Sequence, residues 1–321
     1  MRNIDENQVR WASASKPALG GISFYIIFLF SVSFVGIVHS ADTLIQNKQF
    51  LGILGTVTLA FMIGLADDAY NTRPYLKFSG QLTCGLLLAS TGTYIHFFES
   101  DLLNYVVSVI WVIGIMNSIN MLDNMDGITT NVSIFIIINA IVVLLAVNSF
   151  SSPFFLILIG LLGALIGFLY YNWNPSKIYM GDTGSQFLGA LLGAVSIIYF
   201  WNTPFDLNSK IQLKQIVITA LVFVLPIADT STVVINRLLK KQSPFVGGKD
   251  HTTHHLSYLG FSDKQVALIF IAIATLSVII TFVISVLNIW NTLTVSLSLI
   301  YIISVVVGLY LTTKVKRIPK S

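Results

Sequence analysis

Long apolar stretches, separated by short polar connections, fill most of the chain. A helix of about 20 apolar residues crosses a bilayer, because it hydrogen-bonds its own backbone groups inside the lipid. Ten stretches approach that length, and each is predicted to be a membrane-spanning helix. They are Ala18–His39, Phe50–Ala66, Phe78–Tyr94, Leu103–Met121, Ile128–Val147, Pro153–Tyr171, Gly184–Trp201, Gln215–Asn236, Gln265–Leu287 and Thr292–Thr312.

The composition agrees with this interpretation. Hydrophobic residues make up 55% of the chain and charged residues 10%, and the mean hydropathy is +0.81. Soluble domains carry about 25% charged residues. The sequence therefore predicts an all-α integral membrane protein with about ten transmembrane helices. Its single cysteine, Cys84, excludes an internal disulfide.

Lysine and arginine are divided unequally between the two ends of the predicted spans. With the N-terminus in the cytoplasm, the outer side holds only three of the 18 basic residues, Lys48, Lys210 and Lys214. Cytoplasmic loops are rich in these residues, so both termini are predicted to be cytoplasmic. The cytoplasmic side then holds Arg2, Arg10, Lys16, Arg73, Lys77, Lys177, Arg237, Lys240, Lys241, Lys249, Lys264, Lys314, Lys316, Arg317 and Lys320.

Four polar clusters follow expected spans, and this orientation puts all of them on the cytoplasmic side. Ionisable groups near membrane depth are costly and usually mark function. The first cluster, LADDAYNTRPYLKFSGQ, pairs Asp67 with Asp68 and places Lys77 at the start of the next span. Two carboxylates suit Mg²⁺ or a base beside a metal, and a lysine suits phosphate. A solvated charged loop is the alternative.

The second cluster, NSINMLDNMDG, contains Asp123, Asp126 and three asparagines. The spacing of Asn117, Asn120 and Asn124 predicts one helical face. Carboxylates with amides beside them suit a cation, or a phosphate bound through one. Helix-capping groups at the water boundary are the alternative.

Two further clusters follow: the third has an aspartate between glycines, and the fourth has a group of histidines. YMGDTGSQFLG places Asp182 in a turn before a new span, where Mg²⁺ and a pyrophosphate could bind; an Asp-capped loop is the alternative. GGKDHTTHHLSYLGFS holds three histidines, which we expect to donate to phosphate oxygens, and Asp250, which would cap the next helix or orient a histidine. Asp229 lies inside the eighth span, where it would support the site or pair with Thr230.

Together the clusters resemble the polyprenyl-phosphate N-acetylhexosamine-1-phosphate transferase family, which includes WecA-type and MraY-type enzymes. The resemblance runs from SKPALGG near the N-terminus to the last spans, and the HHL and LPIADT segments look more WecA-like. It implies that Asp67 and Asp68 match the family's paired aspartates, and that Lys77 matches the lysine that holds phosphate. Asp182 matches a magnesium ligand.

The resemblance also assigns a substrate-binding set. It implies contacts with the nucleotide and the diphosphate for Asn117, Asn120, Asp123, Asp126, His251, His254 and His255. The chain departs from the family pattern at Asn124, where a glycine is usual, and at Thr252, where a histidine is usual. His251 stands one place earlier, so which histidine substitutes is open. Only a short polar stretch precedes SKPALGG, where the family usually has another span.

The implied reaction transfers an N-acetylhexosamine-1-phosphate from a UDP-sugar to undecaprenyl phosphate and releases UMP, with Mg²⁺ as cofactor and Mn²⁺ as a substitute. We assign activation of the lipid phosphate to Asp67, and metal binding to Asp68 and Asp182. The implied location is the bacterial inner membrane, with the active site facing the cytoplasm. No nucleic-acid partner is expected, and a homodimer stays open. A transporter with an acidic site on the cytoplasmic side is the alternative.

The expected domain organisation is simple. A cytoplasmic N-terminal segment precedes one polytopic transferase domain, and a basic cytoplasmic tail follows it. These parts are residues 1–17, 18–313 and 314–321, with catalytic loops at 67–77, 120–127, 172–183 and 237–264.

Overall fold

A computed structural model describes residues 16–38, 41–149, 152–203, 213–243 and 248–315. Most of the predicted segment 1–17 and tail 314–321 lies outside these ranges. The described residues form helices and connections without a strand. The helices are α1 Gly20–Val38, α2 Ala41–Gln46, α3 Lys48–Tyr70, α4 Pro74–Ser90, α5 Asp101–Leu122, α6 Ile128–Ala146, α7 Pro153–Asn172, α8 Gly181–Ser196, continued by the π-helix η1 Ile197–Trp201, α9 Leu213–Val222, α10 Val224–Leu239, α11 Thr252–Tyr258, α12 Asp263–Ser285 and α13 Thr292–Thr312.

The predicted membrane architecture is confirmed. Within the described ranges, eight helices are long and apolar enough to cross a bilayer, and α9 with α10 meets the same criteria as a bent pair, which is either a broken span or a re-entrant loop. The expected third span corresponds to α4, which has 17 residues and starts four residues earlier than predicted. The protein is therefore an all-α, multi-pass membrane protein.

The expected eighth span is not one straight helix. Its two halves, α9 and α10, meet at an angle of 75° around Phe223. Pro226 explains the break, because its ring clashes with the carbonyl of the residue four positions earlier and it has no N–H to donate. That earlier residue is Val222, where α9 ends.

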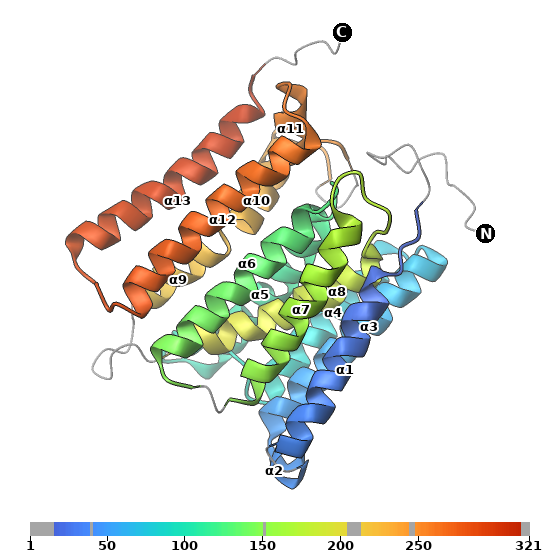
Figure 1. Cartoon of the computed structure of the whole chain (residues 1–321), viewed down its shortest axis with the longest axis vertical. Helices are drawn as coiled ribbons and strands as arrows, with labels where there is room; N and C mark the ends of the chain where they lie inside the picture. The colour runs from blue at the N-terminus through green and yellow to red at the C-terminus, as the bar shows by residue number, and fades with distance from the viewer. Residues whose placement is uncertain (1–15, 39–40, 150–151, 204–212, 244–247, 316–321) are drawn as a thin grey trace.

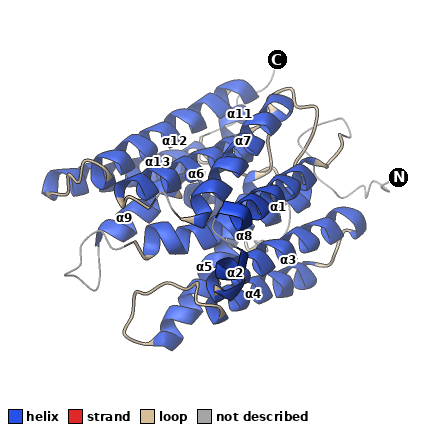
Figure 2. Ribbon diagram, turned by 60° about the horizontal axis from the view of Figure 1, so that its bottom comes forward, coloured by secondary structure: helices blue, strands red, loops and turns tan. Residues whose placement is uncertain are grey.

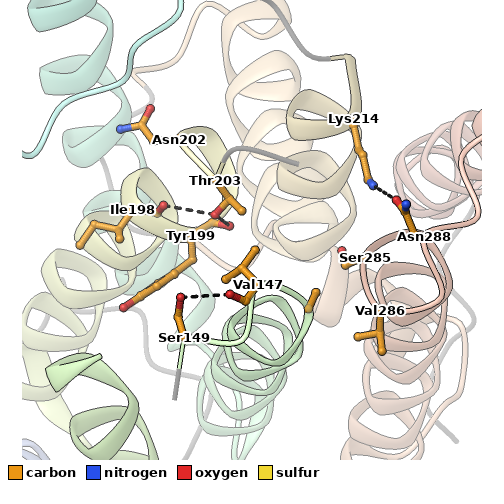
Figure 3. Close-up of a pocket in the computed structure, with 11 residues that line it drawn as sticks. Val147, Ser149, Ile198, Tyr199, Asn202, Thr203, Lys214, Ser285, Val286 and Asn288 are labelled. Carbon is orange, nitrogen blue, oxygen red and sulfur yellow. Dashed lines mark hydrogen bonds between the residues drawn. The ribbon is translucent and has the colours of Figure 1, made fainter. Parts of the chain in front are cut away.

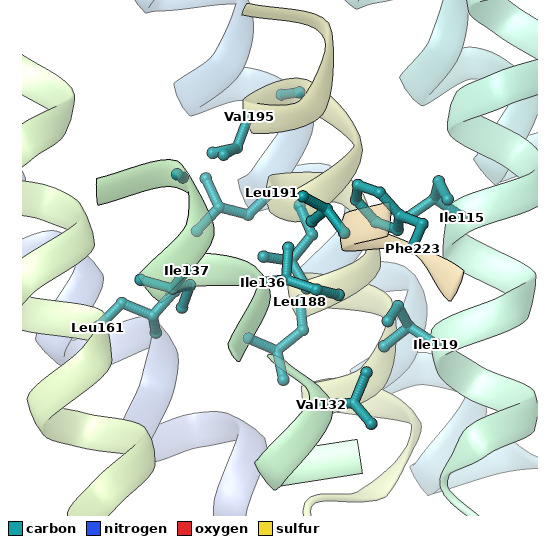
Figure 4. Packing of buried hydrophobic residues seen from close by; sticks show 14 of the residues in the cluster. Ile115, Ile119, Val132, Ile136, Ile137, Leu161, Leu188, Leu191, Val195 and Phe223 are labelled. Atoms are coloured by element: carbon teal, nitrogen blue, oxygen red, sulfur yellow. The ribbon is translucent and has the colours of Figure 1, made fainter. Parts of the chain in front are cut away.

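Helix α8 forms the centre of the bundle, since its span is almost wholly buried and it packs against α1, α3, α5 and α6. Figure 4 shows Leu188, Leu191 and Val195 of this helix among apolar side chains of its neighbours. Helices α1 and α13 are mostly exposed and present apolar side chains outward, as lipid-facing helices do. Figure 1 shows α13 at one side of the bundle, next to α12 and α10.

A glycine lets α3 approach the start of α8 closely. A Cβ atom on Gly64 would overlap the Asp182 carbonyl and the Thr183 Cα. This approach brings the C-terminal end of α3, with Asp67 and Asp68, against the N-terminal end of α8.

Alternating helix directions gather the polar segments at one end of the molecule. Helices α3, α5, α7 and α10 end there, and α4, α6, α8 and α12 begin there. Figure 1 shows α11 at this end and α2 at the opposite end, and Figure 2 gives a second view of the same bundle.

Candidate active site

Lys77 is the centre of a charged cluster formed by three other helices. Its ammonium lies 2.9 Å from Oδ2 of Asp67 and 2.9 Å from Oδ1 of Asp182, and it donates to Oδ1 of Asn120 at 3.3 Å. The side chain of Lys77 is only 17% exposed, so these groups interact with little screening by water. One cation thus joins α3, α4, α5 and α8.

Asp67 is held from the connection that follows α3. The backbone N–H of Thr72 donates to Oδ1 at 2.9 Å, and the Thr72 hydroxyl donates to the same oxygen at 2.6 Å. The chain can turn back in this way because Asn71, in the left-handed region at φ 51°, ends the helix. Asp67 therefore presents Oδ2 to Lys77 in a fixed orientation.

Asp68 points toward the first turn of α8 instead. It accepts hydrogen bonds from the backbone N–H groups of Asp182 and Thr183 at 3.2 and 2.9 Å, and from the Thr183 hydroxyl at 2.7 Å. These N–H groups have no partner inside their own helix, so a carboxylate is stabilising there. Gly181, at φ 72°, makes room, because a Cβ atom on it would lie 2.5 Å from Asp68 Oδ2.

Asp182 lies in the first turn of α8, not in a preceding turn as the sequence indicated. Its Oδ1 accepts from Lys77 and from the amide of Asn120 at 2.5 Å. The same amide of Asn120 also lies 2.8 Å from the Ser185 hydroxyl. Asn120 therefore links α5 to α8 directly beside the charged cluster.

A second layer of amides lies one helical turn deeper in the bundle. Gln81 follows Lys77 by four residues, Gln186 follows Asp182 by four, and Asn117 precedes Asn120 by three. Asn117 donates to Gln81 at 2.8 Å, and Gln81 donates to Gln186 at 3.0 Å. Asn117 thus bonds with this amide layer and supports the charged cluster from below.

Asp123, just past the end of α5, is close to several like charges. Burial, together with repulsion from Asp182, Asp68 and Asp126, raises its pKa to about 8. A bound cation would remove this repulsion.

These carboxylates fit Mg²⁺ by their chemistry. In the described part of the chain no group of three or more His, Cys, Asp or Glu side chains forms a complete metal site. Mg²⁺ usually takes only one or two carboxylates and completes its shell with substrate phosphates and water. Asp182, Asp68 and Asp123 offer hard oxygen donors of this kind, and a carboxylate that accepts hydrogen bonds keeps further lone pairs.

Asp126 holds the connection between α7 and α8. It accepts from the backbone N–H and the hydroxyl of Ser176 at 2.9 and 2.7 Å, and from the Asn174 amide at 3.2 Å. Lys16 lies 3.8 Å away. The contacts of Asp126 are therefore those of a residue that shapes the site.

The histidine segment forms the short helix α11, with His251 as its N-cap residue and His254 and His255 in its turns. The rings of His251 and His254 lie 5.5 Å apart, and both residues are buried. Burial, and then repulsion from His251, lowers the pKa of His254 to about 4, so its ring is neutral at physiological pH. His255 is half-buried, with its ring 5.6 Å from that of Tyr258.

The expected roles of Asp250 and Asn124 are wrong. Asp250 neither caps α11 nor orients a histidine; it forms a two-pronged ion pair with Arg237, at 2.6 and 2.8 Å. Burial raises the pKa of Asp250, but Arg237 outweighs it, and the net pKa is below the usual value. Asn124 does not share a helical face with Asn117, because α5 ends at Leu122.

Asn124 instead joins the histidine helix to the charged cluster. Its Oδ1 accepts from the Thr253 hydroxyl at 2.7 Å. The 123–127 connection therefore contacts α11 through Asn124. Asn120, at the end of α5 just before this connection, contacts Asp182. The four clusters lie together at one end of the molecule.

A cavity of about 660 Å³ lies far from this end. Figure 3 shows it between the ends of α6 and α12, with Tyr199, Asn202 and Lys214 in its lining. The length of α6, roughly 28 Å, separates its described walls from the 123–127 connection. The cavity is therefore not part of the charged cluster.

The sequence matches a family of known proteins. Residues 50–200 match the model described as glycosyl transferase family 4. This region of the chain belongs to glycosyl transferase family 4. It contains the charged cluster and the 123–127 connection, whereas α11 and its histidines lie beyond it.

Likeness to individual relatives extends over more of the chain. A probable undecaprenyl-phosphate N-acetylglucosaminyl 1-phosphate transferase of Bacillus subtilis (strain 168) is 29% identical over 304 residues, which cover 90% of this chain and 79% of that protein. A phospho-N-acetylmuramoyl-pentapeptide-transferase of Streptococcus agalactiae serotype III (strain NEM316) is 33% identical over 205 residues, which cover 58% of this chain and 60% of that protein. The chain therefore resembles proteins whose names describe transfer of N-acetylglucosaminyl 1-phosphate or of phospho-N-acetylmuramoyl-pentapeptide.

Several residues of the site were missed from the sequence. They are Thr72, Thr183, Ser185, Gln81 and Gln186. The two glutamines had a usable signal, because each lies on a predicted helix, four positions after a charged site residue at the start of that helix. The threonines had none, since hydroxyl residues are common beside any helix end.

Proposed function

We propose that the chain transfers an N-acetylhexosamine-1-phosphate from a UDP-sugar to undecaprenyl phosphate and releases UMP. The observation that carries the proposal is Lys77 between Asp67 and Asp182, at the polar end of a membrane bundle. The names of the relatives support the acceptor and the sugar phosphate. We further propose UDP as the nucleotide and an N-acetylhexosamine as the sugar.

The bonds change as follows. An oxygen of the lipid phosphate attacks the β-phosphorus of the UDP-sugar, and the bond from that phosphorus to the bridging oxygen breaks. UMP leaves with the bridging oxygen, and the lipid carries a diphosphate and the sugar. Lys77 stabilises negative charge on the phosphates, which is the main way proteins accelerate phosphoryl transfer.

We assign Asp67 to the attacking phosphate, because Thr72 fixes one of its oxygens and Lys77 contacts the other. Asp68 and Asp182 would hold Mg²⁺, together with Asp123. Mg²⁺, when bound, neutralises charge on the diphosphate. Asn120, Lys77, His251, His254 and His255 would line the substrate site, whereas Asn117 and Asp126 would act through the residues they contact.

The orientation of the site is a further part of the proposal. The polar end would face the cytoplasm of a bacterial inner membrane, where nucleotide sugars occur. A transporter would bind its cargo near the middle of the membrane. The gathering of charged groups at one end of the helices favours the transferase over a transporter.

Purified protein in detergent with undecaprenyl phosphate, Mg²⁺ and a panel of UDP-sugars tests the proposal by release of UMP. We expect UMP with at least one UDP-N-acetylhexosamine, loss of release in EDTA and recovery on addition of Mg²⁺. Folded protein that releases UMP from no sugar would refute the function.

Asp182→Asn tests the proposed metal role of Asp182 in the same assay. It keeps the size of the side chain and its contact with Lys77, but removes the negative charge. We expect a fall in the rate of UMP release of about 100-fold or more, with an unchanged unfolding midpoint. Asp101→Asn, at the exposed start of α5, is the control for loss of one charge. Full activity of Asp182→Asn would rule out its metal role.

A further inference from the structure

Asp229 is a carboxylate in the first half of α10 with no exposed surface. A charge at such a position is costly unless it is paired and hydrogen-bonded. All of its hydrogen bonds run to the start of α11. Its Oδ2 lies 2.8 Å from Nδ1 of His251, and its Oδ1 accepts from the backbone N–H and the hydroxyl of Thr252 at 2.8 and 2.7 Å.

This pairing defines where His251 carries a proton. An ionised carboxylate only accepts hydrogen bonds, so Nδ1 of His251 must donate to Asp229. The second ring nitrogen, Nε2, then keeps its lone pair in the neutral form. Thr230, the neighbour of Asp229, bonds with Ser118 of α5 instead.

The same contacts hold α11 in place. Thr252 is the first residue of this helix, and Thr253 contacts Asn124 in the connection beside the charged cluster. The His254 ring packs on that of His251. A shift of the Asp229 anchor would therefore move both histidines relative to the 123–127 connection.

We propose that Asp229 is a positioning residue of the active site, which fixes the orientation and tautomer of His251 and, through it, the histidine face of α11. The proposal rests on the transferase function proposed above. Asp229 touches neither substrate nor metal in this account, and it acts through His251.

Asp229→Asn separates this role from simple anchoring. The Asn oxygen can still accept from both donors of Thr252, so α11 stays attached. Its NH₂ group, however, faces Nδ1 of His251, which must then accept, and the ring proton moves to Nε2 or the ring turns. We expect kcat/KM for the UDP-sugar to fall about 10- to 100-fold, while KM for undecaprenyl phosphate stays within about twofold.

The controls are chosen on the same two helices. Ser231→Ala removes a hydroxyl that bonds only to carbonyls of α10 and should leave activity unchanged. Thr252→Val keeps the contact of Asp229 with His251 and with the backbone N–H of residue 252, so kcat/KM should fall by less than about threefold. In a His251→Ala background, adding Asp229→Asn should lower kcat/KM by less than about threefold further, because the effects of substitutions at coupled residues do not add.

The outcomes are distinct. Absence of transfer by the wild-type protein would refute the proposed function itself. Wild-type activity with an unaffected Asp229→Asn variant would overturn the positioning role alone, as would full additivity with His251→Ala. If Asp229→Asn does not fold, His251→Ala carries the test, because it leaves the bonds to Thr252 intact. An unchanged kcat/KM in that variant overturns the proposal.

Discussion

Asp123 has the most strongly shifted acidic pKa outside the membrane-spanning helices. Burial and three neighbouring carboxylates raise it to about 8, against about 3.9 in an unfolded chain. As pH rises from 4 to 8, the unfolded chain gives up this proton before the folded protein does. The folded state therefore loses stability across this window, and the loss is complete above pH 8.

Asp123→Asn should remove this pH-dependent loss. In EDTA, we expect its unfolding midpoint to match the wild type near pH 4 and to exceed it by about 2–4 °C at pH 8. Differential scanning fluorimetry in detergent measures both. Asp101→Asn controls for the change in charge. Equal midpoints of variant and wild type at pH 8 would contradict the account of Asp123.

Mg²⁺ gives a second measurement on the same pair of proteins. A ligand that binds the folded state raises its unfolding midpoint. We expect Mg²⁺ to raise the midpoint of the wild type more than that of Asp123→Asn, because the cation neutralises the crowded carboxylates. This measurement does not depend on activity.

The sequence indicated which side chains meet but not which hydrogen bonds and ion pairs they form. Asp67, Lys77, Asn120 and Asp182 stood out as polar groups at the ends of apolar helices, and they are in contact. Their hydrogen-bond partners depend on tertiary geometry. Nothing in the spacing could show that Asp68 faces the start of α8.

The close contact between α3 and α8 places Asp67 and Asp68 beside Asp182. A Cβ atom at Gly64 would overlap the backbone of α8 at Asp182 and Thr183, neither of which can move aside as a flexible side chain would. Gly64→Ala should therefore push the helices apart and break the bonds between Asp68 and Thr183.

We expect Gly64→Ala to lower the free energy of unfolding by about 1–3 kcal/mol and activity by about 10-fold or more. Gly55→Ala, on the same helix, is the matched control, because its Cβ would lie 3.4 Å from a flexible Leu87 side chain. Thermal unfolding and UMP release measure the two effects. Equal behaviour of the two variants would show that the close approach is not needed.

Helix positions followed from hydrophobic pattern, whereas helix ends did not. The pattern of apolar residues continues through Phe223, so Gln215–Asn236 was predicted as one span, and the bend before Pro226 was not predicted. The bounds of α11 were not predicted, because its seven residues, TTHHLSY, show no apolar periodicity. Its position depends on Asp229, which is far away in the sequence.

For the whole molecule, the uneven distribution of lysine and arginine predicts the orientation. In a Cys84→Ala background, we place single cysteines at Ser100, at the outer end, and at Lys240, at the polar end; both residues are exposed. A membrane-impermeant maleimide should label the Ser100→Cys protein in right-side-out vesicles, and the Lys240→Cys protein only in inverted vesicles. The reverse pattern would place the site on the outer side.

The fold class and the common end of the four clusters could be predicted because bilayer thickness and charge bias act on local sequence. The contact of Lys77 with Asp182 and that of Asn124 with Thr253 could not be predicted. Both depend on how α4, α5, α8 and α11 pack. Asp250 shows the limit most clearly, since its partner Arg237 lies on another element.

The fate of the β-phosphorus distinguishes transfer of a sugar phosphate from transfer of the sugar alone. UDP-N-acetylglucosamine labelled with ³²P at the β-phosphate is incubated with the purified protein, Mg²⁺ and undecaprenyl phosphate, and the lipid is extracted. Transfer of a sugar phosphate predicts that the label moves into the lipid while unlabelled UMP appears in the water phase. Label that stays in the water phase as UDP, with sugar on the lipid, would contradict the proposed reaction.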